Sequence, residues 1–279
     1  MSYLSISTWS LHRLLGPLRW TAWDADGQCH VTHEQAQPEQ LSLLQLPHEA
    51  ARRGYAAIEV CHFHFPSVDA EYLAQVREAF ESSGVSFDTL LLDYGDLTTE
   101  DAARLAADLS LMRDWIETAA LCGAKQIRMI AGEAEPTDRD ALHRASRHLL
   151  ELSEYAAARD VIVVTENFKK LTSTGEACSA LMALTGDRVR WITDFGNFGG
   201  ANKYEELHAT LGKSVSVHAK AAYDDRGMPD REEFERCLDE SIQSGFDGAY
   251  VMIYDGPGDM WEGLARVRDI VSARLGAAS

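Results

Sequence analysis

Three residues of the kinds that bind divalent cations follow three successive apolar runs of the sequence. Glu166 follows the run 161–165, Asp194 follows the run 189–193, and His218 ends the run 214–218. Two carboxylates and an imidazole make a mixed oxygen and nitrogen donor set, which suits Mn²⁺, Mg²⁺, Co²⁺ or Zn²⁺. Taken singly, each residue is better explained as a hydrogen-bonded strand end. Three in succession predict a metal site, because the tips of neighbouring parallel strands, about 4.8 Å apart, can converge on one ion.

Other residues with suitable chemistry stand at comparable positions. Lys220, two residues beyond His218, can neutralise negative charge on a substrate, so we assign it a catalytic role together with Glu166. The remaining candidates follow other apolar runs or lie in a long early connection, and we expect them to contact the substrate: Glu59, His62, Arg128, Asn197, Asp255 and Trp20.

Some of these candidates have a second interpretation. Glu59 can bind a sugar hydroxyl or act as an acid or base, but it can equally pair with Arg128. Burying Arg128 without a partner would be costly, so it pairs with Glu59 or Asp93 or binds an anionic group of the substrate. His62 and His64 would share one face of a strand and could clip a metal, although a substrate contact or a loop position is favoured.

The apolar runs alternate with longer amphipathic stretches along the whole chain. Helices are predicted to open at 99–101, 137–138 and 229–230, where Asp, Thr and Pro match the preferences of helix starts. Eight short runs, each followed by a helical stretch, indicate a (β/α)8 barrel. A doubly wound open sheet is the alternative, but no GxGxxG motif follows the first run. The predicted strands are 4–8, 56–61, 86–92, 126–131, 161–165, 189–193, 214–218 and 249–254.

One segment interrupts this alternation. Residues 13–47 form a long connection between the first strand and the first helix, and we expect it to be irregular. A connection of this length is a lid over the site or a peripheral decoration, and Trp20 and Trp23 favour the lid. The 279 residues are thus interpreted as a single domain over 1–279.

Composition and charge exclude several classes of partner. The formal net charge is −18, which disfavours a nucleic-acid backbone and an anionic membrane surface. The N-terminal residues lack the pattern of a signal peptide, and no apolar run is long enough for a membrane helix. The five cysteines are widely spaced, which is typical of a cytoplasmic protein. Assembly into a homo-oligomer stays open.

Short motifs along the chain are similar to those of a known family. They are TEN at 165–167, DFGN at 194–197, HAK at 218–220, GYAAIE at 54–59 and GFDG at 245–248. In this order they resemble the xylose isomerase-like TIM barrel superfamily, which includes sugar phosphate isomerases and epimerases, inosose dehydratases and the endonuclease IV group. The resemblance spans roughly residues 3–275. It implies a barrel enzyme of carbohydrate metabolism.

The resemblance also implies a ligand set that this chain keeps only in part. In such enzymes a Glu, an Asp, a His and a second Glu hold the metal, and the first three match Glu166, Asp194 and His218. The expected second Glu falls at or beside Ile253, and Asp255 is the nearest carboxylate. The ketose epimerases of the family transfer protons with both metal-bound glutamates, so the change questions a two-base epimerase. It leaves room for a one-base isomerase or a lyase.

The favoured interpretation is a divalent-metal-assisted isomerase or epimerase-like enzyme. It would abstract a proton from a small sugar, polyol or related hydroxy-carbonyl compound, with Glu166 as both ligand and base. The alternative is a barrel that binds a small ligand without turnover and holds its metal weakly or not at all. An endonuclease IV-like DNA repair enzyme is less favoured, because it needs further His ligands and Asp93 stands where one would be.

Overall fold

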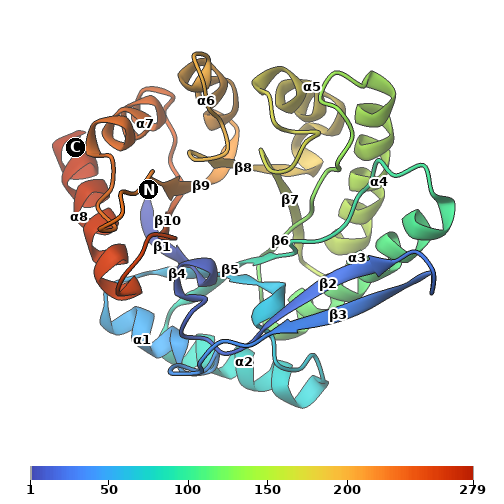
Figure 1. The fold of residues 1–279 in the computed structure, drawn as a ribbon, viewed down its shortest axis with the longest axis horizontal. Helices are drawn as coiled ribbons and strands as arrows, with labels where there is room; N and C mark the ends of the chain where they lie inside the picture. Colours follow the sequence, from blue (N-terminus) through green and yellow to red (C-terminus); the bar gives the residue numbers. More distant parts are fainter. Residues whose placement is uncertain (1, 279) are drawn as a thin grey trace.

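The computed structural model describes residues 2–278 and contains a closed barrel of parallel strands (Figure 1). Around the barrel the order is β1-β10-β9-β8-β7-β6-β5-β4, so strands that are consecutive in the chain are also neighbours in space. This confirms the predicted (β/α)8 barrel and all eight predicted strands to within a few residues. The strands are β1 Tyr3–Ser7, β4 Ala57–Cys61, β5 Ser86–Leu91, β6 Gln126–Arg128, β7 Ile162–Glu166, β8 Arg190–Asp194, β9 Ser214–Lys220 and β10 Ala249–Ile253.

Helices surround the strands in chain order (Figure 1). The side chains of Asp101, Asp138 and Asp230 cap α3, α4 and α7 by accepting backbone N–H bonds at the helix starts, as the sequence predicts. The helices are α1 Leu46–Arg52, α2 Ala70–Ser83, α3 Ala102–Cys122, α4 Arg139–Ala157, α5 Gly175–Thr185, α6 Lys203–Leu211, α7 Arg231–Gln243 and α8 Met260–Ala278, and short 3-10 turns cover Thr8–Leu11, His62–His64 and Gly186–Arg188. Within residues 2–278, none of the helices has the length and hydropathy needed to cross a membrane.

The strands are buried on both faces, which explains their unbroken apolar runs. Every residue of β4 and of β10 is buried, because helices cover the outside of the barrel and side chains fill its inside. Parallel strands all end at the same rim, so the polar residues that follow them meet at one mouth. The barrel therefore acts as a rigid frame for whatever stands at its strand ends.

The long connection over 13–47 is not irregular, which corrects the expectation from sequence. It contains an antiparallel hairpin of β2 Leu18–Asp24 and β3 Cys29–Gln35, with Trp20 opposite His33. Thr, Trp and Val have high strand propensity, and the residues between the strands form the turn, with Gln28 at a φ of 48°. Figure 1 shows the hairpin extending past the barrel strands on the side of α2 and α3.

Two side-chain contacts fasten this hairpin to the body of the protein. His30 Nε2 lies 2.8 Å from Asp108 Oδ1 on α3, and the carboxylate of Asp108 is fully buried. The same carboxylate accepts bonds from Tyr94 Oη and from the backbone N–H of Asp96. Thr21 Oγ1 lies 3.4 Å from His62 Nε2 at the barrel mouth. The hairpin is thus tied to α3 and to the end of β4.

Removing the Asp108 carboxylate should loosen the hairpin. Asp108→Ala leaves His30, Tyr94 and the Asp96 amide without their acceptor, so we expect unfolding free energy to fall by about 3 kcal/mol. Backbone amides of β2 and β3 should exchange faster with solvent than those of the barrel strands, as measured by hydrogen-exchange mass spectrometry. Glu34→Ala breaks an exposed ion pair with Arg19 and should change stability by less than about 0.5 kcal/mol. Uniform acceleration across hairpin and barrel would contradict this anchoring.

Candidate functional site

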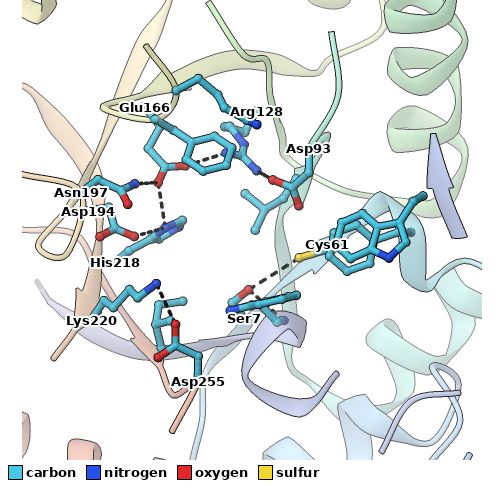
Figure 2. Close-up of a pocket in the computed structure, with 17 residues that line it drawn as sticks. Ser7, Cys61, Asp93, Arg128, Glu166, Asp194, Asn197, His218, Lys220 and Asp255 are labelled. Carbon is cyan, nitrogen blue, oxygen red and sulfur yellow. Dashed lines mark hydrogen bonds and ion pairs between the residues drawn. The ribbon is translucent and has the colours of Figure 1, made fainter. Parts of the chain in front are cut away.

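The three predicted metal ligands meet at the mouth of the barrel. Glu166 ends β7, Asp194 ends β8 and His218 lies on β9, and all three are at least 95 % buried. His218 Nδ1 lies 3.3 Å from Glu166 Oε1 and 3.5 Å from Asp194 Oδ2 (Figure 2). One donor atom of each residue lies within 4.8 Å of the others, an arrangement that could hold a metal ion. Among residues 2–278 this is the one such cluster.

Glu59 lies behind His218 and does not line the cavity, which corrects both interpretations made from sequence. Its Oε2 is 2.7 Å from His218 Nε2, while Thr89 and Ser216 donate to its Oε1. The reason is depth, because Cys61, two residues on along the same face of β4, takes the position that lines the cavity. A carboxylate on the far nitrogen of a histidine fixes the ring and directs Nδ1 to the other ligands.

The charge state of His218 follows from these neighbours. Burial alone would lower the pKa of His218, but Glu166 and Glu59 raise that pKa well above its ordinary value. Without a cation the ring therefore carries a proton at neutral pH. A divalent ion bound by Nδ1 would replace that proton as the positive charge between the carboxylates.

The ligand cluster opens into a cavity of about 280 Å³ with two unlike walls. One wall carries charged side chains from β5 round to the end of β10. The other is largely apolar and includes Trp9, Trp20 and Phe63, whose rings pack on one another with Trp20 and Phe63 centroids 4.4 Å apart. The cavity is lined by Ser7, Trp9, Trp20, Cys61, Phe63, Leu91, Asp93, Arg128, Glu166, Phe168, Lys169, Asp194, Asn197, His218, Lys220, Ile253 and Asp255.

Arg128 forms the centre of the charged wall. Its Nη1 donates to Glu166 Oε2 over 2.9 Å, its Nη2 donates to Asp93 Oδ1, and its guanidinium packs against Phe168. Burial would lower the pKa of Arg128, but Asp93 and Glu166 together hold it above its ordinary value. Of the partners expected from sequence, Asp93 is observed and Glu59 is not, while Glu166 is an additional one.

Lys220 and Asp255 form the other end of the charged wall. Lys220 Nζ lies 2.8 Å from Asp255 Oδ2, and both side chains line the cavity. Burial would lower the pKa of Lys220, but Asp194 and Asp255 raise it. Strand β10 ends at Ile253, so Asp255 lies in the loop beyond it and not on a continued strand. Ile253 itself faces the cavity as an apolar side chain where the family resemblance leads one to expect a glutamate.

His62 does not line the cavity, contrary to the expected substrate contact. It lies in the turn after β4, and its ring packs against Phe63 and Trp115. Its Nδ1 accepts the backbone N–H of Asp93 over 3.2 Å. Burial lowers the pKa of His62 to about 4, so the ring is neutral and can accept this bond. His62 thus holds the Asp93 loop in place.

Two further polar residues complete the site. Asn197 lines the cavity, as expected, and donates from Nδ2 to Glu166 Oε1. Asn167 was not singled out from sequence, yet its side chain donates to the carbonyl of Asp194 and accepts the N–H of Asp194. Asp93 was considered as a partner of Arg128 and as a departure from the endonuclease IV ligand set, but not as a cavity residue, although its position directly after the predicted strand 86–92 was a usable signal. Trp9 and Phe63 were also missed.

Comparisons with known proteins find relatives and structures of the same fold. L-ribulose-5-phosphate 3-epimerase UlaE of Escherichia coli K12 is 27% identical over 201 residues, which cover 65% of this chain and 69% of that protein. The solved structure of an L-ribulose 3-epimerase aligns with a TM-score of 0.73 at 16% identity, covering 100% of this chain and 96% of that one. The IOLI protein with a bound zinc atom aligns with a TM-score of 0.71 at 15% identity, covering 99% of each chain.

The structural likenesses establish the fold, and a sequence model of one family extends over most of the chain. That model, described as xylose isomerase-like TIM barrel, matches residues 47–269. The match includes β4 to β10 and all three residues of the buried ligand cluster. The chain therefore belongs to the xylose isomerase-like TIM barrel family.

Proposed function

We propose that this protein is a divalent-metal-assisted enzyme of the isomerase and epimerase type, which abstracts a proton next to the carbonyl of a small sugar, polyol or related compound. The observation that carries the proposal is the buried cluster of Glu166, Asp194 and His218, in which Glu59 occupies the other ring nitrogen of His218. Two of the proteins named above are epimerases of L-ribulose or its 5-phosphate, which supports a small sugar as substrate.

The donor set fits a divalent ion. The two carboxylates balance its charge, and a histidine whose second nitrogen is held by a carboxylate is the usual form of a metal-binding imidazole. Mn²⁺, Mg²⁺, Co²⁺ and Zn²⁺ all accept oxygen and nitrogen ligands of this kind, and a neighbour of the same fold was solved with zinc. When bound, such an ion would polarise a substrate carbonyl and make the adjacent C–H bond more acidic.

The cavity walls support the rest of the assignment. Arg128, Asn197 and Asp255 expose hydrogen-bonding groups that can orient substrate hydroxyls, and Lys220 can neutralise charge that develops on the substrate oxygen. Trp20 on the hairpin gives the opposite wall an aromatic face that suits the C–H side of a sugar. Trp20 lines one side of the cavity from a hairpin that is tied to α3, which supports a role for this connection as a lid.

A substitution that removes a metal ligand should abolish both metal binding and proton exchange. We expect the native protein to bind Mn²⁺ or Zn²⁺ in calorimetry and, when loaded, to exchange a substrate C–H with D₂O, observed by NMR on L-ribulose, D-allulose and L-ribulose 5-phosphate. Asp194→Asn removes one ligand charge and should weaken metal binding at least about 100-fold and abolish exchange. Native protein that binds no divalent ion, or exchanges no proton with any of these sugars, would overturn the proposed function.

Glu59 should tune metal affinity in a pH-dependent manner. Glu59→Gln removes the negative charge behind His218, so we expect divalent-ion affinity at high pH to fall about 10–100-fold. This difference in affinity between native protein and variant should shrink as the pH falls. In the native protein the pKa of His218 is raised, so its ring must lose a proton before it binds metal, and low pH weakens binding. In the variant the ring binds protons less tightly, so low pH weakens metal binding less. Calorimetric titrations across pH measure both effects. Ser216→Ala, which removes only a 3.4 Å donor to Glu59, is the matched control. A pH-independent deficit would contradict this role.

The substitution Ile253→Glu distinguishes a native enzyme from a barrel that binds a ligand without turnover. The apolar side chain of Ile253 favours this second possibility. Ile253→Glu adds a carboxylate at the cavity wall, so we expect it to tighten metal binding by about 10-fold or more. If the native protein already binds metal and exchanges substrate protons, the variant improves affinity only. If both properties arise only in the variant, the native chain is a ligand-binding form that has lost its chemistry.

A further inference from the structure

The charged wall contains a carboxylate whose setting differs from that of the metal ligands. We propose that Asp93, at the end of β5, is the base that removes the substrate proton, and that Glu166 acts only as a ligand. This inference rests on the proposed function and specifies which residue carries out its chemical step. The acid–base group is then Asp93, which lies on the other side of Arg128 from Glu166, and not one of the metal ligands.

Both oxygens of Glu166 are engaged in the structure. Oε1 faces His218 and accepts a hydrogen bond from Asn197 Nδ2 over 3.3 Å. Oε2, which would have to take up the proton if Oε1 bound the metal, accepts Arg128 Nη1 over 2.9 Å at a fully buried contact. Glu166 therefore has no carboxylate oxygen that is free to approach a substrate C–H bond.

Asp93, unlike Glu166, has one carboxylate oxygen that faces the cavity without a hydrogen-bond donor among the described residues. Arg128 binds its Oδ1, while Oδ2 accepts no hydrogen bond from the described residues, and the side chain is 17 % exposed at the cavity wall. Its backbone N–H is fixed by His62, so the loop that presents the carboxylate is held in place. In Figure 2, Asp93 points to the cavity from the side opposite Asp194. A substrate between these residues would have a metal ligand on one side and Asp93 on the other.

Asp255 is the other carboxylate with an oxygen facing the cavity, and it is less suited to the task. It lies in the loop beyond β10, and its side chain is 30 % exposed, nearly twice the value for Asp93. Its partner, Lys220, forms an ion pair with Asp255 and with no other carboxylate of the described residues. Arg128 is instead shared by Asp93 and Glu166, which leaves a net negative charge at that corner. Asp93 is also the more buried of the two carboxylates, and His62 anchors its backbone.

The chemical step balances without any further reactant. The C–H bond next to the substrate carbonyl breaks, and its proton forms an O–H bond with Asp93 Oδ2. The electron pair of that C–H bond becomes the second bond of an enolate, and the carbonyl pair moves onto oxygen. Return of the proton from Asp93, or of a deuteron after exchange with solvent, reverses these changes. Arg128 remains protonated throughout, because a guanidinium cannot give up its proton under these conditions.

Chemical rescue distinguishes a base from a structural residue. In metal-loaded Asp93→Ala we expect the D₂O exchange rate at saturating L-ribulose 5-phosphate, L-ribulose or D-allulose to fall about 10²–10⁴-fold. The half-saturating sugar concentration should change less than about three-fold, and metal affinity by calorimetry should be retained. Formate, acetate and propionate should restore exchange beside Arg128, with a rate that rises with the basicity of the added carboxylate, as for general base catalysis.

Two variants complete the experiment. Asp93→Asn keeps an acceptor for Arg128 and the shape of the site, so its loss of exchange tests the role even if Asp93→Ala folds poorly. Asp255→Ala is the matched carboxylate deletion in the same cavity, and it should raise the half-saturating concentration without rescue by formate. Exchange by Asp93→Asn within about ten-fold of the native rate would overturn the role of Asp93 alone. A native protein that exchanges none of the sugars would overturn the proposed function and this inference with it.

Discussion

The need to compensate several largely buried carboxylates at the barrel mouth governs the arrangement of the whole site. Ions taken out of water are stable only when opposite charges or donors surround them. Here Arg128 serves two carboxylates, Lys220 serves a third, and His218 lies between Glu59 and the ligand pair. The charged wall therefore intersperses cationic and anionic side chains from β5 to the loop after β10, and Glu166, Asp194 and His218 form the cluster that could hold a divalent cation.

The apolar wall makes this compensation effective. Trp9, Trp20 and Phe63 exclude water from one side of the cavity, and electrostatic interactions strengthen where water is excluded. Trp20 reaches this position on a hairpin that is tied both to α3, through His30 and the buried Asp108, and to the end of β4, through Thr21. The loop inserted after β1 thus contributes to the chemistry of the site without supplying a charged group to it.

Much of the fold and the central cluster could be predicted from the sequence, because both depend on periodicity. Buried strands give continuous apolar runs, and a parallel barrel brings every strand end to one rim, so Glu166, Asp194 and His218 could be placed together. Depth could not be predicted, because residues two apart share a strand face but occupy successive layers. Glu59 and Cys61 illustrate this, since only Cys61 reaches the cavity. The hairpin was missed because neither of its strands alternates between buried and exposed residues: β2 is partly buried along most of its length and β3 is mostly exposed.

Layering also explains the distribution of charge around Ile253, where the family resemblance implies a glutamate. Ile253 on β10 pairs in register with Lys220 on β9, so both lie at the level of the rim, and an apolar side chain there leaves Lys220 without a carboxylate on the strand. Asp255 supplies that partner from the loop beyond. On the opposite side of the barrel, Arg128 on β6 pairs in register with Leu91 on β5. Asp93 follows Leu91 by two residues and lies nearer the mouth. Negative charge absent from β10 is thus present after β5, where a buried guanidinium holds it against the ligand cluster.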